Sequence, residues 1–266
     1  MKMSENNKIA ICFFSGTGNS FDIAQRLSQA LGGASLYNIA TMRDPTVLTQ
    51  YKRVGFVFPV YGFTMPNIVN RFLQSMPFNE NTFYFAVLTK GAFALGANRR
   101  VQQLFKKAGV KLNYIAYVYM PENYILFSKV PSEKIIKTHL ENSKQRVADI
   151  AQDVLCDKVK RARLTVTDIM FGNIIKNISR KESQQWYKTA KKFTVSSSCT
   201  GCSKCAELCP VNNITLSGGK PTFDNRCECC LACIHSCPIQ AIQAERTLGK
   251  KRYSNPNVNL IDMKKY

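Results

Sequence analysis

Residues 199–210 read CTGCSKCAELCP, and residues 227–238 read CECCLACIHSCP. Both stretches follow the spacing C-x2-C-x2-C-x3-C-P, so the chain contains an internal repeat. Cysteine thiolates at such short spacing are soft ligands suited to iron–sulfur clusters. Structural zinc sites use four ligands in two pairs, a pattern that the two copies do not follow. The repeat therefore predicts two 4Fe–4S clusters in the C-terminal quarter of the chain.

Residues 193–248 resemble a bacterial two-cluster ferredoxin, a small α+β module, and all eight ligand positions match. The resemblance implies single-electron transfer at low potential. It also implies crossed ligation, because in that family the fourth cysteine of each motif binds the cluster of the other motif. Cys229 breaks the spacing and is interpreted as a non-ligand, and His235 as a packing or surface residue rather than a ligand. One predicted cluster then takes Cys199, Cys202, Cys205 and Cys237, and the other takes Cys227, Cys230, Cys233 and Cys209.

Residues 1–157 alternate between strand-like and helix-like patterns. Apolar runs typical of strands buried on both faces occur at 8–14, 53–60, 82–89 and 112–120, and 35–39 is expected to be an edge strand. Apolar residues at helical spacing predict helices over 19–31 and from 132 to about 154. Alternation of this kind predicts a doubly wound, five-stranded parallel sheet in an α/β domain.

The loop after the first strand, SGTGNS, is the strongest binding signal of this domain. No lysine follows its glycines, so it is not a Walker A motif, and the third glycine of the dinucleotide fingerprint is replaced by Phe21. Its hydroxyls, glycines and helix N-terminus suit a phosphate monoester. The candidate phosphate-binding residues are Ser15, Gly16, Thr17, Gly18, Asn19 and Ser20.

This loop resembles the FMN phosphate loop of flavodoxins, and the resemblance covers about residues 8–157. It implies the sheet order 2-1-3-4-5, with FMN at the topological switch point between two further loops. No tryptophan occurs in the first of these loops, so Tyr61 or Phe63 is expected to stack on the flavin. Lys90 is expected either near the flavin or in solvent. The candidate flavin residues are Val60, Tyr61, Gly62, Phe63, Thr89, Lys90 and Gly91.

Composition and charge bound the remaining possibilities. The chain has 266 residues, 45% of them hydrophobic, and a formal net charge of +20. No apolar run approaches the roughly 18 residues of a membrane-spanning helix, and no secretory signal is recognisable, so a cytoplasmic location is expected. The basic excess favours an anionic partner. No nucleic-acid-binding module is recognisable, so nucleic acid is not expected as that partner.

Two basic segments flank the repeat. Residues 158–192 are predicted to form a basic, helical linker that packs its apolar face on one of the domains. Docking of an acidic electron carrier and contact with an anionic membrane surface are the alternatives for this linker. Residues 249–266 form a basic tail. The predicted domains are therefore 1–157, the linker 158–192, the ferredoxin module 193–248 and the tail 249–266.

This order of domains resembles the flavodoxin–ferredoxin fusion proteins of anaerobic bacteria. The resemblance implies an electron-transfer iron–sulfur flavoprotein with two 4Fe–4S clusters and FMN, exchanging electrons with a redox protein such as an acidic ferredoxin, flavodoxin or oxidoreductase. The alternative is a flavoenzyme that reduces a small organic substrate, with the clusters as its internal electron supply. A redox sensor would carry an output module, and none is recognisable.

Overall fold

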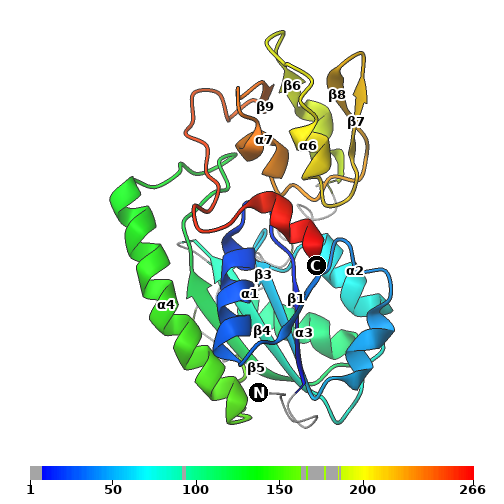
Figure 1. Ribbon diagram of the computed structural model, residues 1–266, viewed down its shortest axis with the longest axis vertical. Coiled ribbons are helices and arrows are strands. Elements are labelled where there is room, and N and C mark those ends of the chain that lie inside the picture. The colour runs from blue at the N-terminus through cyan, green and yellow to red at the C-terminus, as the bar shows by residue number, and fades with distance from the viewer. Residues whose placement is uncertain (1–7, 92–93, 163–165, 167–176, 178–184, 186) are drawn as a thin grey trace.

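The computed structural model describes residues 8–91, 94–162, 166, 177, 185 and 187–266. Its first part is a five-stranded sheet in the order β2-β1-β3-β4-β5, and every neighbouring pair is parallel (Figure 1). This topology confirms the predicted doubly wound, flavodoxin-like α/β fold. The strands are β1 Ile9–Phe13, β2 Ser35–Asn38, β3 Arg53–Pro59, β4 Phe83–Lys90 and β5 Leu112–Tyr119.

Alternating residues of the buried strands point to opposite faces of the sheet and build two cores. Ile9, Ile11 and Phe13 belong to one core, which α1 (Asn19–Ala30) and α4 (Glu133–Leu155) cover. Ala10 and Cys12 belong to the other, which α2 (Asn67–Ser75) and α3 (Ala97–Lys107) cover. A short 3-10 helix, η2 (Pro45–Gln50), precedes β3. Both faces of β1 are fully buried, which is why its sequence is a continuous apolar run.

The cysteine-rich part is a small α+β unit at the carboxyl edge of the sheet (Figure 1). Two antiparallel strand pairs frame it, β6 with β9 and β7 with β8. Its elements are β6 Thr194–Val195, α6 Lys204–Glu207, β7 Ile214–Ser217, β8 Lys220–Phe223, α7 Ala232–Ser236 and β9 Ile242–Gln243. Its own apolar cluster includes Ile214, Leu231 and Ile234, together with Ile125 from the loop after β5. The unit therefore shares its core with the first domain.

Residues 249–266, which we call the C-terminal segment, return to the first domain and lie across α1 (Figure 1). Leu260 and Met263, both in the 3-10 helix η4 (Leu260–Lys265), are buried in the core that α1 and α4 cover. The Tyr266 ring lies 6.1 Å from that of Phe13 and 5.8 Å from that of Phe21. Residues 249–266, which we interpreted from their charge as a basic tail, thus pack against the first domain.

Most of the predicted linker helix lies outside the described residues, which in this region are 158–162, 166, 177, 185 and 187–192. Lys160 bridges to the outer edge of β5, where its carbonyl accepts a hydrogen bond from Ile115 N at 2.9 Å. The 3-10 helix η3 (Ala190–Lys192) ends the segment, with Lys188, Lys191 and Lys192 exposed. Across the described part of the chain, every helix is too short or too polar to cross a membrane.

Candidate cofactor sites

A cavity of about 410 Å³ lies at the carboxyl ends of β1, β3, β4 and β5, and we call it the edge cavity. Every residue predicted to hold FMN lines it except Gly18. Met120, Pro121, Glu122, Asn123, Tyr124, Phe127 and Ser128 from the loop after β5 complete the wall, together with Cys229 from the second cysteine motif. This is the position at which open α/β sheets bind ligands, because adjacent connections leave the sheet in opposite directions there.

The turn from β1 to α1 presents hydroxyl groups that can donate hydrogen bonds. Gly18 takes the left-handed conformation with φ 93°, and no side chain caps the first turn of α1. Gly18 N donates to Ser15 Oγ at 3.1 Å, and Asn123 Nδ2 donates to Thr17 Oγ1. Both hydroxyl oxygens therefore act as acceptors within the protein and keep their O–H group for a ligand. Ser20 Oγ and Thr89 Oγ1, 2.7 Å apart, share one hydrogen bond, so this pair also keeps one O–H.

Asn19 lines the edge cavity, but its side chain has a structural role. Its Nδ2 donates to Pro121 O at 3.0 Å. Its Oδ1 accepts from Tyr253 Oη at 2.7 Å and from Asn255 Nδ2 at 3.2 Å. Only the backbone N–H of Asn19 is then oriented by the helix toward a ligand at the start of α1.

The loop after β3 forms a tight turn in which Tyr61 and Thr64 exchange both backbone hydrogen bonds, at 3.0 and 2.9 Å. The two central residues, Gly62 and Phe63, have φ values of 50° and 62°. Positive φ at both positions defines a type I′ turn. Arg100 Nε donates to Phe63 O at 2.6 Å and fixes the turn against α3. The turn presents Tyr61 and Phe63 at the cavity wall, as the sequence predicted for a stacking aromatic.

Two more aromatic rings line the same cavity, those of Tyr124 and Phe127, which stack on each other with centroids 5.7 Å apart. The Lys90 ammonium lies over the rings of Tyr117 and Tyr119, at 4.9 and 4.1 Å from their centroids. Burial raises the pKa of Tyr61 well above its usual value, and the thiols of the second motif add to the rise. The phenol of Tyr61 is therefore neutral.

The second cysteine motif gathers around the fourth cysteine of the first motif. Four thiols line one small cavity under η3, and we call them the proximal cluster site: Cys209, Cys227, Cys230 and Cys233. Burial raises the pKa of Cys230 well above its usual value, and the other three thiols of the site contribute by proximity. Asn213 N donates to Cys209 Sγ at 3.2 Å, the type of bond that stabilises a thiolate ligand.

The first three cysteines of the first motif and the last cysteine of the second are assigned to what we call the distal cluster site: Cys199, Cys202, Cys205 and Cys237. Burial raises the pKa of Cys205, and the thiols of Cys202 and Cys237 add to the rise because they lie nearby. Ala241 N donates to Cys237 Sγ at 3.2 Å, repeating the Asn213–Cys209 contact of the proximal site. Cys202 is exposed. The structure thus brings Cys209 to the second motif and Cys237 to the first, the crossed arrangement that the ferredoxin resemblance implied.

The proximal cluster site is packed directly against the phosphate loop. A Cβ atom built on Gly16 would lie 2.8 Å from Cys230 O and 3.1 Å from Tyr61 Oη, so only glycine fits at this position. Cys229, a non-ligand in the sequence interpretation, is 2% exposed and lines the edge cavity, where its Sγ lies 3.3 Å from Tyr124 Oη. One backbone loop therefore forms a wall of both sites.

Two contacts across this boundary were not predictable from motif spacing. Glu228, 3% exposed, accepts hydrogen bonds from Ile68 N at 3.0 Å and from Arg71 Nη2 at 2.6 Å. His235 Nδ1 accepts from Tyr253 N at 3.1 Å, so its Nε2 carries the proton and donates to Asn123 O at 2.8 Å. Burial lowers the pKa of His235 to about 4, and the ring is neutral. His235 is a packing residue, as its position between ligands suggested.

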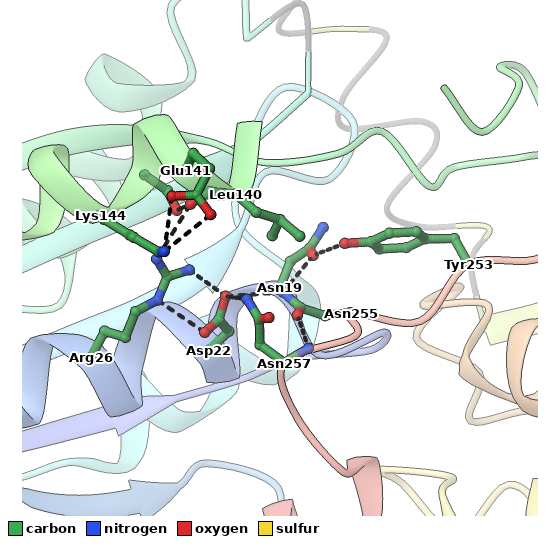
Figure 2. A network of polar contacts seen from close by, with 10 residues as sticks. Asn19, Asp22, Arg26, Leu140, Glu141, Lys144, Tyr253, Asn255 and Asn257 are labelled. Atoms are coloured by element: carbon green, nitrogen blue, oxygen red, sulfur yellow. Dashed lines mark hydrogen bonds and ion pairs between the residues drawn. The ribbon is translucent and has the colours of Figure 1, made fainter. Parts of the chain in front are cut away.

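The C-terminal segment fastens the phosphate loop from the outside (Figure 2). Asn255 N donates to Thr17 O at 2.9 Å, and Asn255 Nδ2 donates to Asp22 Oδ2 at 3.1 Å. Asp22, 4% exposed, also pairs with Arg26 on the next turn of α1. A Cβ atom on Gly18 would approach Val258 to 2.7 Å, so the segment packs directly on the loop. No motif marks this contact in the sequence.

Residues 194–215 match the family described as a 4Fe-4S binding domain. The fold and this match define the class of protein: an iron–sulfur protein in which a flavodoxin-like α/β domain is joined to a 4Fe–4S binding domain. No curated protein sequence matches the chain.

Solved structures similar to this chain include several flavodoxins. A flavodoxin from Streptococcus pneumoniae TIGR4 is 16% identical, with 56% of this chain and 97% of that chain covered and a TM-score of 0.39. A short-chain flavodoxin associated with a non-canonical PDU bacterial microcompartment is 14% identical, with coverages of 57% and 99% and a TM-score of 0.41. Rubredoxin oxygen:oxidoreductase from Desulfovibrio gigas is 15% identical, with coverages of 57% and 37% and a TM-score of 0.40.

Proposed function

We propose that this chain is a flavodoxin–ferredoxin fusion protein that binds FMN in the edge cavity and one 4Fe–4S cluster at each cluster site. It relays electrons between the clusters and the flavin, and it exchanges them with low-potential redox partners. The observation that carries the proposal is the shared loop: residues 227–230 supply thiols to the proximal site while Cys229 lines the edge cavity. Electron transfer weakens with distance, and this loop borders both sites.

The edge cavity fits FMN by the chemistry of its donors. Ser15 and Thr17 keep their O–H groups at the start of α1, where backbone N–H groups also favour an anion. Tyr61, Phe63 and Tyr124 provide apolar rings where the isoalloxazine would lie. FMN, when bound, exchanges electrons singly or in pairs, so the protein would connect one-electron and two-electron partners.

The cysteine sites fit iron–sulfur clusters because each gathers thiols from both motifs. Backbone N–H groups of Asn213 and Ala241 donate to Cys209 and Cys237, one in each site. Hydrogen bonds of this kind stabilise thiolates and set the potential of a bound cluster. The proximal site faces the edge cavity, whereas Cys202 of the distal site is exposed. Electrons would therefore enter or leave the protein at the distal site and reach the flavin through the proximal one.

The experiment is an anaerobic redox titration followed by visible absorption and EPR spectroscopy. We expect about eight iron and eight sulfide per chain, one FMN, and electrons that distribute between clusters and flavin without any added partner. Bound zinc without acid-labile sulfide would overturn the cluster assignment. Flavin and clusters that fail to equilibrate within the same molecule would overturn the relay.

The alternative is a flavoenzyme that reduces a small organic substrate. The Tyr124–Cys229 contact favours it, because a phenol at the cavity wall is a candidate proton donor. Saturable turnover of a small organic acceptor that is lost in Tyr124→Phe would support this alternative. In the relay, the acceptor is another redox protein, and the same substitution leaves exchange with that protein in place.

A further inference from the structure

A groove of about 390 Å³ lies between the end of α7 and the C-terminal segment, beside the distal cluster site. Of the four thiols of that site, only Cys237 borders the groove among the described residues, so the groove is separate from the cluster cage. Its lining residues include Lys204, Ser236, Arg252, Leu260 and Ile261.

Two buried donors at this groove have no acceptor in the described structure. Ser236 is 7% exposed, and its Oγ makes no hydrogen bond. Arg252 Nε is also buried without a partner. The guanidinium is held in place at its other nitrogens, since Nη1 donates to Thr247 O at 3.1 Å and Nη2 to Gln243 Oε1 at 2.6 Å. Because both atoms are buried, a partner in the groove meets the charge of the Arg252 guanidinium rather than its Nε or the Ser236 hydroxyl.

The charge of the groove indicates the kind of acceptor. Lys204 and Arg252 are its cationic side chains, and no acidic residue is found among the described residues that line it. Arginine and lysine beside a hydroxyl are typical partners of a carboxylate. Part of the wall is apolar, with Leu260 buried and Ile261 40% exposed. A cationic centre with apolar neighbours fits an acidic protein surface better than a free inorganic anion.

We propose that this groove is the docking site of an acidic electron-transfer protein, the carboxylates of which are attracted by the charges of Lys204 and Arg252 beside Cys237. This inference rests on the proposed function and adds the place of exchange and the chemistry of the partner. On docking, the reduced partner gives up one electron, which passes to the cluster at the distal site, and no bond is made or broken. The reverse transfer uses the same contact.

The test measures the second-order rate of electron exchange with an acidic flavodoxin by anaerobic stopped flow, from low to moderate salt. Lys204→Glu and, separately, Lys204→Gln/Arg252→Gln are compared with Lys106→Gln/Lys107→Gln. The control pair loses two exposed charges at the C-terminal end of α3, at the opposite edge of the sheet. The Arg252 side chain holds Thr247 and Gln243 through hydrogen bonds, whereas no side-chain hydrogen bond or ion pair of Lys204 is found among the described residues. Lys204→Glu therefore tests the groove even where Arg252→Gln disturbs the segment.

We expect the groove variants to slow exchange at low salt by about tenfold or more and to flatten its salt dependence, because steering charges accelerate association by 10–10³-fold. The control should keep both the rate and the salt slope. A zwitterionic viologen separates docking from a change in the cluster: equal slowing with the viologen and the flavodoxin would overturn the proposal. The proposal would also be overturned if the exchange rate of the groove variants kept its salt dependence and lost it only when Lys188, Lys191 and Lys192 were neutralised. Electron equilibration within the unmodified protein, without partner, tests the proposed function independently.

Discussion

The carboxylate of Glu228 lies 2.6 Å from Nη2 of Arg71 and is almost fully buried, although the arginine side chain is 58% exposed. Its other oxygen accepts the backbone N–H of Ile68 in the first turn of α2. Glu228 therefore caps a helix of the first domain from a loop of the second. Because its neighbours Cys227 and Cys230 belong to the proximal cluster site, this side chain also helps to hold that site against the first domain.

The first prediction concerns the contacts of Glu228 with α2. Glu228→Gln keeps the shape of the side chain but removes its charge, and we expect it to lower the free energy of unfolding by about 1.5–3 kcal/mol, the usual contribution of a hydrogen bond to a charged group. The urea midpoint measures this, and stopped-flow absorption should show slower transfer between cluster and flavin. Glu245→Gln, at an exposed position of the same domain, is the control. An unchanged urea midpoint would show that the contacts of Glu228 with α2 do not stabilise the protein.

The second prediction separates the two cluster sites. Cys209→Ala should leave about four iron per chain and disconnect the flavin, because the cluster that it removes is the one beside the edge cavity. Cys237→Ala should leave the same amount of iron, but the flavin should still exchange electrons with the remaining cluster. EPR spectra measure which cluster is lost, and flavin absorption measures whether the flavin still exchanges electrons. The crossing is wrong if Cys209→Ala removes the signal of the cluster bound by the first motif.

The third prediction concerns the phosphate loop. Thr17→Val removes one O–H donor without changing the size of the side chain, and we expect FMN to bind about ten- to a hundredfold more weakly, as for a hydrogen bond to a charged acceptor. Riboflavin, which lacks the phosphate, should bind weakly to both proteins and be little affected. Fluorescence titration measures both ligands, with Thr138→Val on α4 as the control. Equal affinity for FMN and riboflavin in the unmodified protein would contradict the phosphate role.

The fourth prediction concerns the C-terminal segment. Asn255→Ala removes the side-chain hydrogen bonds to Asn19 and to the Asp22 carboxylate. The loosened phosphate loop should bind FMN about two- to tenfold more weakly, which corresponds to about 0.5–1.5 kcal/mol of binding free energy. Asn225→Ala, exposed in the loop after β8, is the matched control. The same fluorescence titration applies. FMN affinity that survives the loss of Asn255 would limit the segment to a packing role.

The sheet and the residues of both cysteine motifs were predictable because each leaves a local pattern, whereas the order of the strands was implied by the resemblance to flavodoxins. Apolar runs such as 53–60 mark buried strands, and the spacing of the cysteines is dictated by the cluster that they wrap. The carboxyl ends of parallel strands meet at one edge of the sheet. We could therefore predict from the sheet order that the loops after β1, β3 and β4 form one wall.

The contacts between the two domains left no such pattern. Glu228 looks like one more charged residue in a cysteine motif, and only the fold reveals that it reaches α2. Cys229 was interpreted only as a non-ligand, yet its side chain lines the edge cavity. Residues 249–266 were interpreted from their basic charge alone. Their apolar residues Leu260, Met263 and Tyr266 pack on α1 and β1, and this contact is visible only in the fold. Long-range pairings of this kind depend on surfaces that neither segment has alone.

The burial of Leu260 and Met263 beneath α1 also sets an order of events during synthesis. Residues 258–266 leave the ribosome after both cysteine motifs, so the first domain stays without part of its core while the second is being made. Both cysteine motifs are therefore complete before the phosphate loop is fastened, and part of the core of the first domain stays uncovered in the interval. Folding of the first domain is thus completed only after the cysteine-rich unit has been made, although the first domain comes first in the chain.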